Sequence, residues 1–173
     1  MRTWLPYAFF ASLGLLVAAT ADDIGKKMVD PVTNKEVTVA KETPTVIVNG
    51  NHLYFADAKN RDAFLKAPET FLSKTKLECP VKGFPIKGAS KANRVVVNDQ
   101  IVYFCCGNCP MAFAKEPNNF LDKVSDPVSG KEFGLSADAP KTTYKNGIYF
   151  FESNDNKATF EKEPAKYAKV VLQ

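Results

Sequence analysis

Runs of β-branched and aromatic residues recur along the chain in three pairs, and two turn residues split each pair. The turns are Asn49-Gly50, Asn98-Asp99 and Asn146-Gly147, and these residue types tolerate the positive φ angles of a tight hairpin turn. The pattern therefore predicts three β-hairpins. Their strands are expected at residues 45–48 and 52–55, 95–97 and 101–104, and 142–144 and 148–151.

A helical segment is expected after each hairpin. The pattern Phe-x-x-x-Pro-x-x-aromatic occurs at residues 64–71, 113–120 and 160–167. Proline cannot continue a helix interior, but it suits a first turn. We therefore expect one helix to end before each proline and a short second one to begin there, with the following aromatic residue folded back onto the hairpin.

The recurring pattern defines three tandem copies of one small unit. The triplets that open them are Asp30-Pro31-Val32, Cys79-Pro80-Val81 and Asp126-Pro127-Val128. The predicted fold is α+β, with a hairpin and short helices in each of residues 22–75, 76–123 and 124–173. Units of this size are near the lower limit for burying a stable core. They are therefore expected either to pack together or to remain separate units of marginal stability. The sequence leaves both arrangements open.

Residues 1–21 differ from the rest. Arg2 precedes an apolar run from Trp4 to Ala19, and Ala19-Thr20-Ala21 then offers small residues for cleavage. This is the pattern of a secretory signal peptide, and the run is shorter than the ~20 apolar residues of a membrane span. We predict cleavage after Ala21, export to the periplasm or the extracellular space, and no transmembrane span in the mature chain.

Composition and motifs exclude several classes of function. With 45% hydrophobic and 24% charged residues, the chain is a globular protein rather than a disordered one. Its net charge of +4 comes from dispersed lysines, so nucleic acid is not expected as a partner. With a single histidine, no nucleophile elbow and no phosphate loop, the sequence predicts no enzyme.

Three of the four cysteines lie close together in the middle copy, at Cys105, Cys106 and Cys109, and Cys79 opens that copy. The outer copies have the same hairpin and helix pattern without any cysteine. If they fold alike, sulfur is not required for the fold, and the cysteines serve a function.

These features together resemble the YHS/TRASH family of small metal-associated domains. The features that carry this resemblance are the opening Asp/Cys-Pro-Val, the hairpin that ends in two aromatic residues, the cysteines after it and the helical Phe-x-x-x-Pro-x-x-aromatic pattern. The resemblance covers nearly all of the chain after residue 21 and implies treble-clef-like units. It also implies a soft or borderline metal, in heavy-metal sensing or trafficking. In the middle copy, Cys79, Cys105 and Cys109 fall on the family's metal-ligand positions.

The chain departs from the family at one ligand position and in both outer copies. Many members begin Cys-Pro-x-Cys, whereas Lys82 stands at the fourth position here. Cys106 is an additional candidate ligand, but the neighbour of a strand-end residue normally points the other way. The positions that match Cys105 and Cys109 are occupied in the outer copies by Ala56 and Asn60, and by Glu152 and Asn156.

Local geometry is expected to favour the thiolate form. Pro110 suits a first helical residue, so Cys109 is expected at the N-cap, where the helix dipole lowers a thiol pKa. Lys82 lies close to Cys79 in sequence and acts in the same direction. Three thiolates suit copper(I), which accepts low coordination, whereas zinc needs a fourth ligand such as Cys106 or water.

Two other interpretations remain. In one, the copies are a structural or partner-docking array for a protein in the export compartment, and the cysteines form disulfides. In the other, the cysteines form a thiol–disulfide exchange module. The Cys106-x-x-Cys109 spacing fits that chemistry, but no βαβ context surrounds it.

Overall fold

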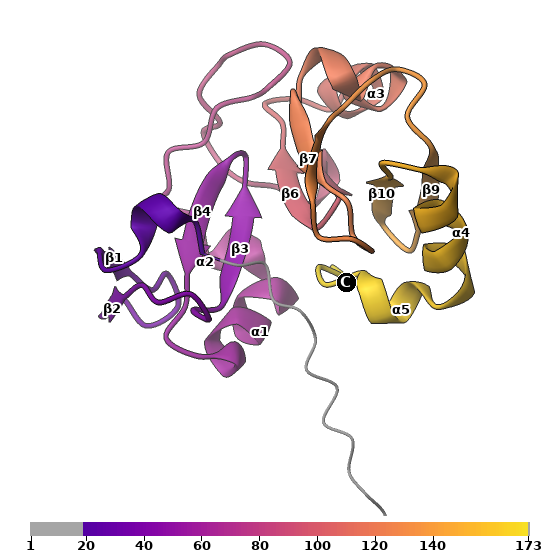
Figure 1. The fold of residues 1–173 in the computed structure, drawn as a ribbon. Helices are drawn as coiled ribbons and strands as arrows, with labels where there is room; N and C mark the ends of the chain where they lie inside the picture. Colours follow the sequence, from indigo (N-terminus) through magenta and orange to yellow (C-terminus); the bar gives the residue numbers. More distant parts are fainter. Residues whose placement is uncertain (1–18, 173) are drawn as a thin grey trace, which may run out of the picture.

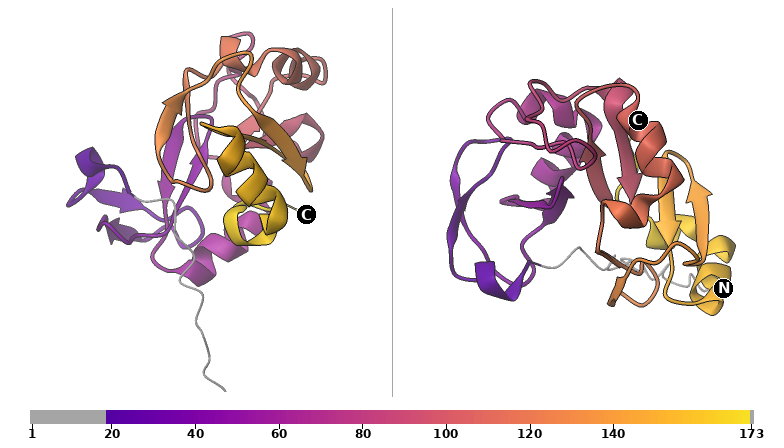
Figure 2. Two further views of the ribbon diagram at one scale, coloured as in Figure 1. Left: turned by 45° about the vertical axis from the view of Figure 1, so that its right-hand side comes forward. Right: turned by 90° about the horizontal axis from the view of Figure 1, so that it is seen from above.

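Three β-hairpins join edge to edge into one six-stranded sheet (Figure 1). The structure is a computed structural model that describes residues 19–172. The predicted signal peptide lies almost wholly outside these residues and stays a prediction. We refer to residues 22–75, 76–123 and 124–173 as the first, middle and last segments. They follow one another across the molecule in chain order (Figures 1 and 2).

The fold is α+β, as predicted, and helices follow every hairpin. In the first segment the elements are β1 (Lys27–Val29), β2 (Glu36–Thr38), β3 (Thr45–Val48), β4 (Asn51–Tyr54), α1 (Ala58–Lys66) and α2 (Pro68–Phe71), after the 3-10 helix η1 (Ala21–Asp23). The middle segment has η2 (Lys91–Asn93), β5 (Arg94–Val97), β6 (Gln100–Tyr103), α3 (Cys109–Lys115) and η3 (Pro117–Asn119). The last has β7 (Lys123–Ser125), β8 (Glu132–Gly134), β9 (Lys141–Tyr144), β10 (Gly147–Phe150), α4 (Asn154–Lys162) and α5 (Pro164–Tyr167).

The strand order of the large sheet is β4-β3-β6-β5-β10-β9. Within a hairpin the strands are antiparallel, whereas β3 pairs with β6, and β5 with β10, in parallel. The first strand of one hairpin therefore pairs with the second strand of the next. The three hairpins therefore form one continuous sheet and are not separate folding units.

Two asparagines fasten the hairpins to one another. Asn98, in the turn of the middle hairpin, donates to the carbonyls of Ser125 and Phe150 and accepts from the Phe150 amide. Asn49 makes the same three contacts one segment earlier, with Glu78 and Tyr103. Lys145 holds the matching turn position in the last hairpin, whose strand β9 is an edge of the sheet.

The third turn differs from the prediction by one residue. Its two residues are Lys145, with a φ of 51°, and Asn146, whereas Gly147 begins β10 and pairs with Tyr144. Gly147 is required for space rather than for a positive φ, because a Cβ there would lie 2.7 Å from the Tyr149 ring.

One aromatic contact is repeated in all three segments. The phenylalanine after each hairpin packs on the helix phenylalanine at the same ring-centroid distance, 5.3 Å. The aromatic residue beyond each proline then contacts the helix phenylalanine. The pairs are Phe55 with Phe64, Phe104 with Phe113 and Phe151 with Phe160.

The predicted helix break at proline is present in each segment, although the middle one continues as a 3-10 turn. Residues after α5 return across the molecule, where Val170 and Leu172 join a core that includes Val46 and Phe64 of the first segment. Among the residues that the structure describes, no helix combines the length and the apolar character needed to cross a bilayer.

Candidate metal centre

Three cysteine sulfurs of the middle segment meet at one point. The Sγ atoms of Cys79, Cys105 and Cys109 all lie within 4.8 Å of one another. Cys79 and Cys109 are each 1% exposed, and Cys105 is half-buried. The sequence predicted that these sulfurs would converge, although they come from an opening loop, the end of a strand and the start of a helix.

A tight turn places Cys79. The Cys79 amide donates to the Phe84 carbonyl at 2.9 Å, and the Gly83 amide donates to the Cys79 carbonyl at 2.7 Å. Gly83 adopts a φ of 65°, which glycine tolerates without strain. A bridge between Glu78 and Pro85 closes the base of the loop. The backbone of Cys79 is therefore fixed by the hydrogen bonds of its own loop.

Backbone amides surround the Cys79 sulfur. Burial acts to raise the pKa of this thiol, but amide hydrogen bonds from Cys105, Lys82 and Val81 outweigh it and hold the pKa below its usual value. Hydrogen bonds to the charged form favour that form. Cys79 is thus the member of the cluster best prepared to carry a negative charge.

Cys109 differs from the sequence prediction in two ways. It is the first residue of α3 rather than its N-cap, which is Asn108. The pKa of Cys109 is raised to about 12, by burial first and then by the neighbouring sulfurs, so the expected lowering was wrong. The pKa of Cys105 is also raised, mainly by burial. A cation that bound here would displace protons from both thiols.

In the first segment, a carboxylate occupies the place of the Cys79 sulfur. Asp30 is fully buried, and its Oδ1 accepts from the amides of Val32 and Thr33 at 2.7 and 3.2 Å. Its Oδ2 accepts from the Ala56 amide at 2.9 Å and from the Asn60 side chain at 2.8 Å. Burial opposes ionisation, but these bonds hold the pKa of Asp30 below its usual range.

The last segment repeats this arrangement. Asp126 is also fully buried and accepts from the amides of Val128, Ser129 and Glu152 and from the side chain of Asn156. We call each of these two arrangements an aspartate clasp: Asp30 with Asn60, and Asp126 with Asn156. The aspartate and asparagine positions of a clasp hold Cys79 and Cys109 in the middle segment, and Cys105 matches Ala56 and Glu152, whose backbone amides donate to the aspartate.

The aspartate clasps were missed in the sequence. Alignment of the three copies placed Asp30 and Asp126 against Cys79, and Asn60 and Asn156 against Cys109. The signal was the recurrence, in both outer copies, of an aspartate and an asparagine at the two positions that hold cysteines in the middle copy.

Cys106 lies outside the three-sulfur group, although its Sγ atom is 3.2 Å from that of Cys109. It is half-buried. Its pKa is lowered to about 7, first by the hydrogen bond with the Cys109 thiol and then by the amides of Asn108 and Cys109. All four cysteines are within the described residues, and each is a free thiol.

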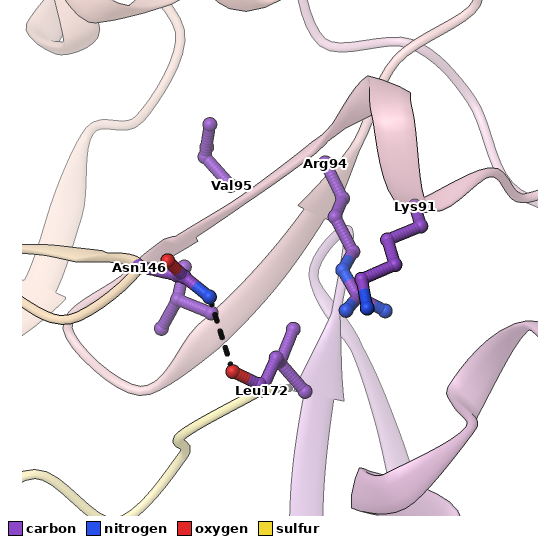
Figure 3. A pocket seen from close by; sticks show the side chains of 6 residues that line it. Lys91, Arg94, Val95, Asn146 and Leu172 are labelled. Atoms are coloured by element: carbon purple, nitrogen blue, oxygen red, sulfur yellow. Dashed lines mark hydrogen bonds between the residues drawn. The ribbon is translucent and has the colours of Figure 1, made fainter.

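A pocket of about 360 Å³ lies elsewhere, and no cysteine lines it (Figure 3). The side chains of Lys91 and Arg94 point into it, and the Asn146 side chain donates to the Leu172 carbonyl at its edge. Arg94 also pairs with Glu69. This pocket shares no residue with the three-sulfur group.

The three thiols fit a soft or borderline cation. Sulfurs that bind one zinc ion at about 2.3 Å in tetrahedral geometry are about 3.8 Å apart. The sulfurs of Cys105 and Cys109 are 3.8 Å apart. A scan against protein-family models and searches of curated proteins and of solved structures found no match for the chain. The candidate site therefore rests on its own geometry.

Proposed function

We propose that this chain is a metal-binding protein that holds one soft or borderline cation through the Sγ atoms of Cys79, Cys105 and Cys109. Soft thiolate ligands select copper(I) and zinc, whereas hard cations prefer oxygen ligands. The role is binding, in trafficking or sensing, and not catalysis.

The observation that carries the proposal is the exchange of an aspartate clasp for three sulfurs at matching positions. In the outer segments, Asn60 and Asn156 donate to the buried carboxylate and so join the opening loop to the helix. A cysteine at the asparagine position has no side-chain amide, so it cannot make the hydrogen bond that joins the loop to the helix. A metal bound to Cys79 and Cys109 makes the same connection.

Coordination number favours copper(I). Three sulfurs converge, and the fourth cysteine of the chain, Cys106, lies outside their group. Copper(I) is stable with three thiolates, whereas structural zinc takes four ligands. Zinc with water or a displaced Cys106 as the fourth ligand is the alternative.

The wider proposal follows the sequence resemblance. We propose three tandem units of the YHS/TRASH type after a signal peptide, in a protein exported to the periplasm or the extracellular space. The middle unit binds the metal. The outer units are scaffold, or surfaces for a protein partner in that compartment. Their aspartate clasps support this division, because they close the same fold without sulfur.

Metal analysis of the reduced full-length chain tests the proposal. After loading with copper(I) or zinc and desalting, we expect about one equivalent of metal. The matched control is Cys79→Asp with Cys105→Ala and Cys109→Asn, which installs the first segment's residues at the three matching positions. This variant is expected to keep its circular dichroism spectrum and to bind no metal. Equal loading of the variant and the parent, or of Cys109→Ser and the parent, contradicts the proposed site.

A further inference from the structure

The sulfur of Cys106 stands where the outer segments place an oxygen. Asp57 Oδ1 accepts from the Asn60 amide at 2.8 Å, and Ser153 Oγ accepts from the Asn156 amide at 3.2 Å. At the matching residue of the middle segment, the Cys109 amide donates to the Cys106 carbonyl at 3.3 Å, and the Cys106 sulfur lies 3.2 Å from the Cys109 sulfur. Aspartate and serine are among the best capping residues, so capping does not require a thiol at this position.

Cys106 and Cys109 are placed to react with one another. Their sulfurs are 3.2 Å apart, closer than the 3.8 Å between Cys105 and Cys109. Cys106 is half-buried, whereas Cys109 is buried. Two cysteines in Cys-x-x-Cys spacing at the start of a helix form the arrangement of thiol–disulfide exchange sites.

We propose that Cys106 and Cys109 form a thiol–disulfide exchange site whose oxidation by a small-molecule disulfide withdraws Cys109 from the metal centre. The exchange itself depends only on these two thiols. Its effect on the metal rests on the proposed function of the three-sulfur group.

The reaction takes two steps. The Cys106 thiolate attacks one sulfur of the small-molecule disulfide and displaces a thiolate, which leaves a mixed disulfide on Cys106. Cys109 then attacks the Cys106 sulfur and displaces the second small thiolate. Two protein thiols are oxidised to one disulfide and the oxidant is reduced to two thiols. Cys106 gives up its proton, and Cys109 gives up either its proton or its bond to the metal.

The two states of Cys109 exclude one another. A sulfur bound in a disulfide is no longer an anionic ligand, and only Cys79 and Cys105 then remain for the cation. By linkage, a bound metal also disfavours the disulfide, because it occupies the Cys109 sulfur that the disulfide needs. The pair thus makes metal retention depend on the thiol redox state of the surroundings.

Exposure of the full-length protein to oxidised glutathione tests the inference. In the metal-free protein, alkylation and peptide mass spectrometry are expected to find the Cys106–Cys109 disulfide. In the metal-loaded protein, metal capture by a chromophoric chelator is expected to accompany that disulfide. Cys106→Ser, which copies Ser153 of the last segment, should lower the rate of metal release to about a tenth of the parent's rate or below. Cys106→Asp, which copies Asp57, should behave in the same way.

The two proposals fail separately. A disulfide between Cys105 and Cys109, or one that includes Cys79, overturns the exchange site. Equal rates of metal loss from the parent and both Cys106 variants overturn the proposed withdrawal of Cys109 from the metal centre. A metal-free protein that forms the Cys106–Cys109 disulfide but never binds metal supports the exchange site and removes the metal centre.

Discussion

The Asn60 side chain donates a 2.8 Å hydrogen bond to the buried carboxylate of Asp30, and these two residues match Cys109 and Cys79 of the middle segment. One loop-to-helix contact is thus made by an acid–amide pair in one part of the chain and by two converging thiols in another. The opening loop closes in the same way in both segments, because the amide four residues further on donates to the carbonyl of Asp30 or of Cys79, and the residues at the ligand positions differ.

A metal site can therefore be installed in the first segment. Asp30→Cys with Ala56→Cys and Asn60→Cys reproduces the three sulfurs of the middle segment at matching positions. We expect metal bound to the reduced protein to rise from about one equivalent to about two, because three convergent thiolates bind soft cations. Elemental analysis after desalting measures the gain.

The single variant Asp30→Cys is the control, since one sulfur beside Ala56 and Asn60 supplies only one ligand. It should add no equivalent. A triple variant that keeps the parent's circular dichroism spectrum yet binds no additional metal would show that position alone does not create the site.

The three-sulfur cluster was predictable because its residues are rare and clustered in the sequence. Cys105 and Cys109 follow a recognisable hairpin, and Cys79 opens the same copy. The protonation of Cys109 was not predictable, because a helix start suggests a lowered pKa, whereas burial and three neighbouring sulfurs raise it. The aspartate clasps were missed because Asp30 reaches Asn60 across 30 residues, and sequence does not tell which way a side chain points.

Asn98 is expected to be essential for the joint between the middle and last hairpins. Its side chain makes three hydrogen bonds, at 2.7 to 2.9 Å, and all lie in buried or half-buried surroundings. Asn98→Gly keeps a residue that tolerates the φ of 44° while it removes these bonds. We expect a loss of roughly 2–4 kcal/mol in the free energy of unfolding, measured by urea denaturation.

Asn146→Gly is the matched control, because Asn146 is also a turn residue but, among the described residues, makes a single side-chain hydrogen bond, of 3.1 Å, to Leu172. It should cost clearly less than Asn98→Gly. Equal losses in the two variants would mean that the bonds across hairpins add nothing beyond the turn.

The hairpins themselves were predictable, but the sheet they build was not. Asn49 and Asn98 were identified as turn formers from the residues on either side of them. Their second role depends on partners 54 and 52 residues away, Tyr103 and Phe150. No local pattern encodes such a contact, so the sequence left open whether the units pack together.

Asp99 makes stability depend on pH in an unusual direction. Its carboxylate is 5% exposed and accepts from the amides of Lys169 and Val170, which fixes the residues after α5 against the sheet. Burial raises the pKa of Asp99 from 3.8 to about 6, against the effect of these bonds. The folded state therefore holds this proton more tightly than the unfolded state does. The Asp99 contribution to the free energy of unfolding should fall as pH rises from about 4 to about 6, by at most about 3 kcal/mol.

Asp99→Asn isolates this contribution, because asparagine keeps an oxygen acceptor, tolerates the φ of 64° and does not titrate. The ionisable groups that interact with this carboxylate are Lys169 and Tyr149. Burial lowers the pKa of Lys169 and raises that of Tyr149. Urea denaturation at several pH values should show the variant gaining on the parent between about pH 4 and about pH 6, with a constant difference above that. Parallel profiles for the two proteins would mean that Asp99 ionises in the folded state as easily as in the unfolded one, and that its two amide bonds fully offset its burial.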